Sequence, residues 1–236
     1  MKKTGEPRQN MTDLSKFVDK LGEDLVNCKL NCEGIDKRVP PRCFFLENRN
    51  HKNRLDCIIV GQNPGLASER EKEEYRKHKT YTTIKNYAIE YFIGERPQPY
   101  YKRARRFAKE LGWGESILWT ELCKCQSGLE TINGKKKKKQ VPLQTFRNCI
   151  KNFLEKELKN FPGTPIIALG HEAFVAVSYR FPNRFVIGIP HPRGARGKKF
   201  LSLFKNDKLQ RKLKDKYKKR IVEAKRDECI RIFPES

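Results

Sequence analysis

The sequence predicts a single α/β domain with a mostly parallel four-stranded central sheet flanked by helices. Four short apolar runs are expected to form buried strands, and segments with helical spacing of apolar residues lie between them. Strands that alternate with helices are typical of parallel sheets, which bury both faces. The length of 236 residues suits one such domain, and the sequence contains no internal repeat.

The first predicted element is a helix over residues 13–27. Thr12 is a suitable N-cap, and apolar residues follow it at helical spacing, namely Leu14, Phe17, Val18, Leu21 and Leu25. Residues 1–11 form a predicted polar tail without the apolar stretch of a signal peptide. A polar loop then ends in Val39-Pro40-Pro41.

The four predicted strands are Cys57–Val60, Ile117–Leu122, Pro165–Leu169 and Arg184–Ile189. Helical patterns separate them, for example over Tyr100–Leu111 and Phe146–Leu158. Ligands of open parallel sheets bind at the carboxyl ends of the strands. We therefore expect the functional residues directly after each strand.

Two charged segments complete the predicted organisation. Residues 134–140 contain five consecutive lysines and form a loop insertion in the domain, which spans residues 12–205. Like charges repel, so we expect a disordered surface loop, with phosphate contact as a second interpretation. Residues 206–236 form a basic C-terminal helix and tail. The helix extends from about Asn206 to Arg226, and its apolar stripe is expected to dock on the domain.

The formal net charge of +24 predicts a polyanionic partner, and nucleic acid is the first candidate. A solubilising surface is the second interpretation, because solubility needs less charge of either sign. A membrane surface is the third, and no run of about 18 apolar residues predicts a spanning helix. We expect a cytoplasmic monomer. Its eight cysteines are then not a disulfide framework, and Cys57 is expected to be buried and inert.

Two loops rich in glycine and proline follow the first and the fourth predicted strands. The first reads Gly61-Gln62-Asn63-Pro64-Gly65, and the second runs from Pro190-His191-Pro192 to Gly197. Such residues fix tight loops whose backbone can approach a ligand closely. Since both loops leave the same edge of one sheet, Asn63 and His191 are expected to meet at one cleft.

These segments resemble the motifs of the uracil-DNA glycosylase superfamily. Ile58–Gly65 resembles its first motif, in the Asn-Pro-Gly variant of the mismatch-specific and single-strand-selective branches, and the His191-Pro192 loop resembles its second. Two further segments, Ile166–Ala173 and Thr120–Cys125, resemble those of the thermophile-type iron–sulfur branch. The resemblance covers about Cys28 to Arg196 in matching order.

This resemblance implies an enzyme that flips a base out of DNA and hydrolyses its N-glycosidic bond, leaving an abasic site. By resemblance, His191 donates to the O2 of the base, the backbone at Gly61 and Gln62 assists, and Asn63 positions the water. Other branches carry Asp in place of Asn63, so slower chemistry is expected here.

Further residues are expected to hold the base and the DNA. A flipped base usually stacks on an aromatic ring, and the candidates are Phe92, Tyr100 and Tyr101. The alternative is that two of these three belong to the core. Residues after the His-Pro pair are expected to fill the gap in the stack or to clamp phosphates, namely Arg193, Arg196, Lys198 and Lys199.

The iron–sulfur branch holds a [4Fe-4S] cluster with four cysteines. The matching positions here are Cys28, Cys32, Cys125 and Cys149. The first pair is spaced one residue further apart than in that branch, and Cys43 or Cys123 remain alternative ligands. Zinc is the competing metal, because four thiolates also suit it. Unrelated free thiols are the third interpretation, and a cluster would have a structural role.

Glu121 departs from the iron–sulfur branch, where an Asn at this position hydrogen-bonds uracil. An ionised carboxylate repels O4 of uracil but accepts from the N4 amine of cytosine. Burial favours the protonated form, which also donates to N3. The resemblance therefore allows a uracil-type substrate or a modified cytosine, as in some phage DNA, and hence repair or antiphage defence. The alternative is that Glu121 pairs with a nearby lysine.

Two other classes of protein are alternatives to this enzyme. A non-catalytic nucleic-acid-binding protein on a glycosylase scaffold is the first, and the presence of both Asn63 and His191 argues against it. A nucleotide-binding regulator is the second, but the sequence has neither a P-loop nor a G-x-G-x-x-G motif.

Overall fold

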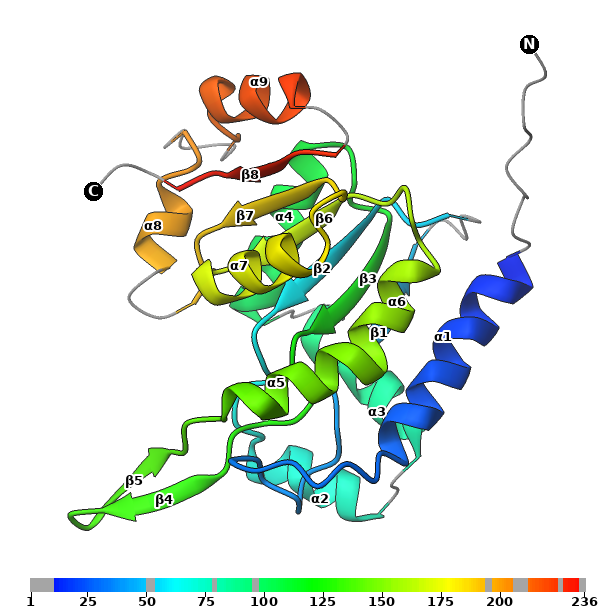
Figure 1. Cartoon of the computed structure of the whole chain (residues 1–236), viewed down its shortest axis with the longest axis vertical. Coiled ribbons are helices and arrows are strands. Elements are labelled where there is room, and N and C mark those ends of the chain that lie inside the picture. Colours follow the sequence, from blue (N-terminus) through cyan, green and yellow to red (C-terminus); the bar gives the residue numbers. More distant parts are fainter. Residues whose placement is uncertain are drawn as a thin grey trace.

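The structure of the protein, a computed structural model, describes residues 11–49, 54–77, 80–94, 98–193, 197–205, 212–224 and 227–233. It is an α/β domain with a central sheet between layers of helices, so the predicted fold class is confirmed (Figure 1). Within these residues, no helix has the length and apolar character that crossing a membrane requires.

The large sheet contains six strands in the order β1-β3-β2-β6-β7-β8. The four predicted strands form its parallel centre and are β2 (Cys57–Gly61), β3 (Ser116–Glu121), β6 (Ile166–Leu169) and β7 (Val186–Ile189). Two edge strands were not predicted, because each is too short for a clear pattern. β1 (Phe45–Asn48) runs antiparallel to β3, and β8 (Cys229–Arg231) runs parallel to β7.

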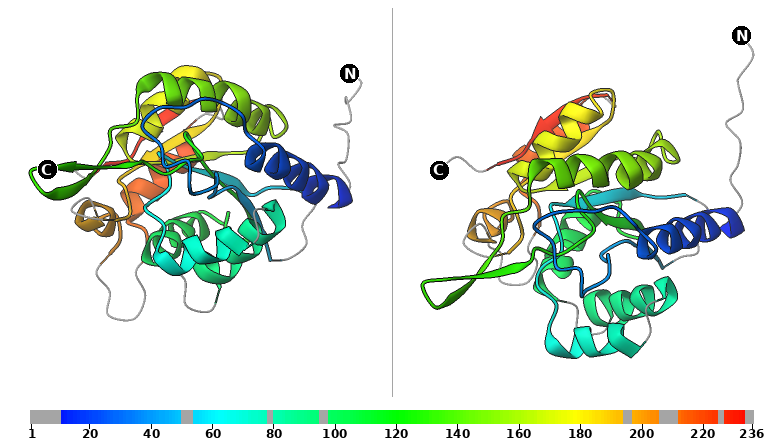
Figure 2. Two further views of the ribbon diagram at one scale, coloured as in Figure 1. Left: turned by 90° about the horizontal axis from the view of Figure 1, so that it is seen from below. Right: turned by 60° about the horizontal axis from the view of Figure 1, so that its bottom comes forward.

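Helices cover both faces because successive residues of a strand point to opposite sides. Ile58 and Val60 of β2 pack with the elements of one layer, which are α1 (Met11–Val26), α5 (Leu143–Cys149), η2 (Ile150–Leu154), α6 (Glu155–Lys159) and α7 (His171–Arg180). Ile59 packs into the other layer with η1 (Ala88–Ile93), α4 (Pro99–Glu110), α8 (Gly197–Leu201) and α9 (Asp215–Glu223). Figure 2 shows the sheet between α5–α7 and α4.

A third, smaller cluster lies beside the loop after β2. It joins Val39 and Ala67 to α2 (Glu69–Lys77) and α3 (Tyr81–Tyr87), through Tyr75 and Ile84. Glu71 of α2 lines the cavity of the site described below, so this cluster fixes part of the cavity wall.

The lysine-rich segment is a hairpin, and the prediction of a disordered loop is wrong. β4 (Leu129–Ile132) pairs antiparallel with β5 (Lys135–Lys138). Asn133 and Gly134 both have positive φ, at 51° and 72°, which suits the two-residue turn that joins twisted strands. Consecutive lysines point to opposite faces of the hairpin, so the repulsion between neighbours is reduced.

The C-terminal segment also differs from its prediction. The predicted helix from Asn206 to Arg226 is shorter, because α9 covers only Asp215–Glu223, while residues 206–211 and 225–226 lie outside the described residues. The segment after α9 adds strand β8 to the sheet. Its brief apolar stretch at residues 229–232 is interrupted by Arg231, which obscured this pairing.

Candidate active site

A cavity of about 710 Å³ opens at the carboxyl ends of the central strands. Its wall combines the loop after β2, the start of α4, the end of β3 and the loop after β7, and includes Gln62, Asn63, Tyr100, Glu121, His191 and Arg193. The structure thus brings Asn63 and His191, which lie 128 positions apart in the sequence, to one cavity. The parallel sheet explains this, because its strands end at one edge.

Asn63 is held from the segment that follows β3. Its Nδ2 atom donates to the hydroxyl of Ser127 at 3.1 Å. Ser127 is itself fixed by a bridge to Ile35 of the N-terminal segment. This contact sets the rotation of the Asn63 amide at the cavity wall.

Gly61 and Gln62 bind the backbone that continues from β3. Their carbonyl oxygens accept from the N–H groups of Leu122 at 2.9 Å and Cys123 at 3.0 Å. A Cβ atom on Gly61 would collide with the Glu121 carboxylate and with the Tyr100 hydroxyl. Glycine therefore lets the end of β2 approach these two side chains.

Glu121 ends β3 and is buried, with 4% of its surface exposed. Its Oε2 atom has no hydrogen-bond partner among the described residues. Burial raises the pKa of Glu121 to about 8, although the positive charges of Lys124 and Arg42 oppose the shift. A buried carboxyl with an unused oxygen can form a hydrogen bond with a ligand in the cavity.

Lys124 does not form an ion pair with the Glu121 carboxylate in this structure. Its ammonium group is fully buried, pairs with Glu157 at 2.8 Å and donates to the hydroxyl of Thr120, and its hydrogen bond to Glu121 goes to the backbone oxygen at 2.7 Å. Among the residues that the structure describes, no lysine forms an ion pair with the Glu121 carboxylate, so the alternative interpretation receives no support from them.

The three aromatic candidates have different positions. Tyr101 is buried in the core, where its ring lies 5.0 Å from that of Trp119 and its hydroxyl donates to the Cys43 thiol at 3.3 Å, and it also lines the cavity. Tyr100 is half-buried at the cavity, and its ring centroid lies 5.4 Å from that of His191. Phe92 is part of η1, but its side chain lies outside the described residues.

His191 is positioned by the turn that follows it. Its Nδ1 atom lies 3.2 Å from the backbone N–H of Arg193 and 3.3 Å from the carbonyl oxygen of that residue. Arg103 of α4 donates to the carbonyl oxygen of Pro192 at 2.6 Å and ties this loop to the other wall of the cavity. Sequence reasoning missed Arg103, because no local pattern marks a contact between α4 and this loop.

The predicted DNA-binding residues lie next to the same loop. Arg193 is exposed and lines the cavity, and Lys198 and Lys199 are exposed on α8. Arg196 lies outside the described residues. Of the described members of this set, Arg193 thus lies at the cavity, whereas Lys198 and Lys199 lie on the helix that follows the loop.

A buried arginine, which sequence reasoning also missed, supports the loop after β2. Arg42 is 3% exposed, forms an ion pair with Glu71 at 3.1 Å, and donates to Gln126 at 2.8 Å and to the carbonyl oxygen of Gly65. Gln126 in turn accepts from the N–H of Ala67 at 2.7 Å. This network fixes the path of the chain directly after Asn63.

Several predicted cysteine ligands lie near one another, and all eight cysteines are free thiols. Cys149 contributes to a raised pKa of both Cys28 and Cys32, for which burial is the main cause. Cys149 also accepts from the N–H of Lys124 at 3.4 Å and hydrogen-bonds the thiol of Cys123.

The remaining cysteine candidates occupy two different places. Cys125 raises the pKa of Cys123, so it belongs to the same group of thiols, whereas Cys43 lines the cavity beside Tyr101. Within the described ranges, no three His, Cys, Asp or Glu side chains stand in a ligand arrangement for a metal ion.

A family model described as the uracil DNA glycosylase superfamily is similar to residues 50–219 of the chain, which is well over half of its length. The matched range includes both loops of the cavity, the strands β2, β3, β6 and β7, and the lysine hairpin. A comparison with curated proteins gives no match.

Proposed function

Because the chain belongs to the uracil DNA glycosylase superfamily, we propose that it flips a nucleotide out of DNA and hydrolyses the N-glycosidic bond, leaving an abasic site. The observation that carries this proposal is the placement of Asn63 and His191 on one cavity at the carboxyl ends of β2 and β7. The exposed Arg193 at the cavity and the net charge of +24 support DNA as the partner.

His191 is suited to stabilise the departing base. Nδ1 accepts from the N–H of Arg193 when the ring proton is on Nε2, and donates to the carbonyl oxygen of Arg193 when the proton is on Nδ1; the proposed role uses the first tautomer, with the proton on Nε2. That proton can be donated to O2 of the base, where negative charge develops as the bond breaks. The turn at Arg193 and the contact from Arg103 keep the ring in place for this step.

Asn63 is suited to hold the water that attacks the sugar. An amide takes a proton poorly, so it positions the water rather than activating it as a strong base. Such an arrangement fits a dissociative reaction, in which the bond to the base breaks before water attacks a cationic sugar. Tyr100, beside His191, is the described aromatic side chain best placed to stack on the flipped base.

Glu121 supports a cytosine-type base as the substrate. Its protonated carboxyl has one donor and one acceptor, which match N3 and the N4 amine of cytosine and also O4 and N3–H of uracil. Its ionised form has acceptors only, so one oxygen accepts from N4–H of cytosine or from N3–H of uracil while the other faces an acceptor of the base. Because the pKa of Glu121 is about 8, the protonated form predominates near neutral pH, and it matches both bases. We place the cytosine-type base first because Glu121 stands where the iron–sulfur branch has the Asn that hydrogen-bonds uracil.

The cavity also leaves room for a modified base. Cavities of about 300–1,000 Å³ take drug-sized ligands, and the volume here of about 710 Å³ exceeds the needs of an unsubstituted pyrimidine. Release of ordinary cytosine would damage the host genome. A modified cytosine of phage DNA is therefore the proposed substrate, which would give the enzyme a role in defence. Uracil is the second candidate, because the protonated carboxyl matches it.

We also propose that Cys28, Cys32, Cys125 and Cys149 hold a [4Fe-4S] cluster, with zinc as the competing metal. Their thiols come from three distant segments, and Cys149 raises the pKa of Cys28 and Cys32 while Cys125 raises that of Cys123. No three of them stand in a ligand arrangement in this structure, so these side chains would have to move together to hold the group. Thiolates are the ligands that such clusters require. The group would supply no chemistry to the reaction. It would join the segment after α1 to the base of the lysine hairpin and to α5.

The proposed function is tested by an abasic-site assay on DNAs that carry uracil, hypoxanthine or modified cytosines, as single strands and as duplexes. We expect release of one modified cytosine, with weaker release of uracil. DNA binding without release of any of these bases would favour the non-catalytic alternative.

A further inference from the structure

We propose that the β4–β5 hairpin is a DNA-binding arm whose lysines contact backbone phosphates next to the nucleotide in the cavity. The inference rests on the proposed function in so far as DNA is the substrate. The arm comprises residues 129–138 and projects from the body of the domain (Figures 1 and 2).

The lysines belong to a regular β-hairpin rather than to an irregular loop of solvated charges. Its strands pair over four positions, from Leu129 with Lys138 to Ile132 with Lys135. Its base is fixed to the body by two backbone hydrogen bonds. The backbone N–H of Lys139 donates to the carbonyl oxygen of Gly128 at 2.8 Å, and the N–H of Gly128 donates to the carbonyl oxygen of Gly34 at 2.8 Å. The four lysines of β5 are therefore presented on a defined support.

Each face of the arm carries two lysines. Residues that are paired across the strands share a face, so Lys136 and Lys138 lie with Leu129 and Thr131, while Lys135 and Lys137 lie with Glu130 and Ile132. All four lysines are exposed, and no carboxylate of the described ranges forms an ion pair with them. Their charges are available to an external anion.

The arm is continuous with the proposed active site. Lys138 lines the same cavity as Asn63 and Glu121, so the face with Lys136 extends outward from the cavity wall. In addition, the hairpin begins two residues after Ser127, which holds the Asn63 amide. A DNA strand that places a nucleotide in this cavity would have neighbouring phosphates within reach of the arm.

The chemistry favours phosphates over base edges. Lysine is a compact point charge without the paired donors that distinguish bases, and phosphate contacts account for most of the salt dependence of DNA binding. A two-stranded ribbon is also narrow enough to enter the major groove, where phosphates line both sides. We therefore expect binding that is independent of sequence.

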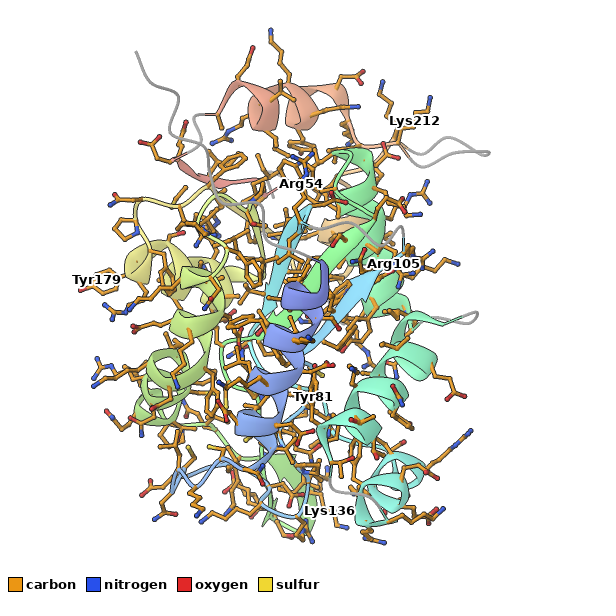
Figure 3. All side chains as sticks on the ribbon, turned by 90° about the vertical axis from the view of Figure 1, so that its right-hand side faces the viewer. Arg54, Tyr81, Arg105, Lys136, Tyr179 and Lys212 are labelled. Carbon is orange, nitrogen blue, oxygen red and sulfur yellow. The ribbon has the colours of Figure 1, made fainter. Side chains whose placement is uncertain are left out.

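The test compares two triple variants with equal loss of charge. Lys135→Gln/Lys136→Gln/Lys137→Gln removes three charges from the arm and retains the cavity residue Lys138. The matched control, Lys216→Gln/Lys218→Gln/Lys219→Gln, removes three exposed charges from α9. The two sites lie at opposite ends of the molecule (Figure 1), and Figure 3 labels Lys136 near one end and Lys212, just before α9, near the other.

Binding to a duplex with one stable abasic-site analogue is measured as a function of salt. Each lost phosphate contact lowers the slope of log affinity against log salt by about 0.9, so the arm variant should lower it by about 2–3 and the α9 variant by less than about 1. Lys135→Arg/Lys136→Arg/Lys137→Arg should keep the slope. Replacing the phosphates beside the analogue by neutral methylphosphonates should weaken the wild type more than the arm variant.

Equal slopes for the wild type and the arm variant, or equal losses in both glutamine variants, would overturn the proposal. The probe requires no base release, so the two proposals can fail separately. If the arm variant lowers the slope but no DNA loses a base, the DNA-binding role of the arm is supported and the glycosylase function is contradicted. If a base is released and the arm variant keeps the wild-type slope, only the DNA-binding role of the arm is contradicted.

Discussion

Gly61 and Glu121 are the last register pair between β2 and β3, and the Glu121 carboxylate occupies the space where a Cβ atom on Gly61 would lie. This pairing places the buried Glu121 carboxyl at the wall of the cavity, beside the backbone two residues before Asn63. Because the packing is so close, substitution at either position should change the site in a defined way.

Gly61→Ala should disrupt the site, since its Cβ would overlap Glu121 and Tyr100. Overpacking of this kind costs about 1–3 kcal/mol, so we expect a lower melting temperature together with loss of base release. Gly65→Ala is the matched control in the same loop, because a Cβ there meets no atom within 4 Å. Equal effects of the two variants would show that Gly61 is not constrained by Glu121.

Glu121 should make the stability of the protein depend on pH. Its pKa is raised to about 8 by burial, from an ordinary value of 4.5, so between these values the folded state binds more protons than the unfolded state. The free energy of unfolding should therefore fall as pH rises from about 5 to 8. Thermal unfolding of Glu121→Gln should show a weaker decrease over this range. Parallel curves for the two proteins would contradict the raised pKa.

The preference between bases should also follow Glu121. Glu121→Asn should raise the activity on uracil relative to a cytosine-type base, because the amide donates to O4 and accepts from N3–H. A bidentate contact is worth about 1–3 kcal/mol, so the ratio of single-turnover rates should change about ten-fold or more. Glu121→Gln keeps the length of the side chain and should blur the preference rather than invert it. An unchanged ratio in both variants would place Glu121 outside base recognition.

The proposed cluster predicts a brown protein with visible absorbance and bound iron. Replacing Cys125 or Cys149 by Ser should remove the iron and lower the yield of folded protein, whereas Cys229→Ser should do neither. Cys229 is a suitable control because it lies on the edge strand β8, apart from the other thiols. Metal analysis that gives zinc without iron would contradict the cluster and favour the competing metal.

Much of the architecture could be predicted from the sequence, since the four central strands are short and apolar, and loops rich in glycine and proline follow β2 and β7. The edge strands could not, because β1 and β8 are brief and mix polar with apolar residues. Strand β5 could not be predicted either, because five consecutive lysines suggested repulsion between neighbouring charges. The Asn133-Gly134 pair, however, is typical of the two-residue turn of a hairpin.

The parts of the site that follow strands could be located by the same reasoning, as Asn63 and His191 illustrate. Residues that act through distant partners could not. Arg42 and Gln126 form their contact across 84 positions, and Arg103 reaches Pro192 across 89. No local periodicity encodes such pairs. The sequence also could not tell which of Tyr100 and Tyr101 contacts His191 and which packs against Trp119, because this depends on the orientation of α4.

The measurement that tests the central claim most directly is single-turnover base release by the wild type, Asn63→Ala and His191→Ala on one cleavable DNA. Loss of one group that stabilises charge in the transition state costs about 10²–10³-fold in rate. We expect losses of this size in both variants, with DNA affinity kept within a few-fold, because affinity comes from the basic surface. Normal turnover in both variants would contradict the assignment of Asn63 and His191 as the catalytic residues.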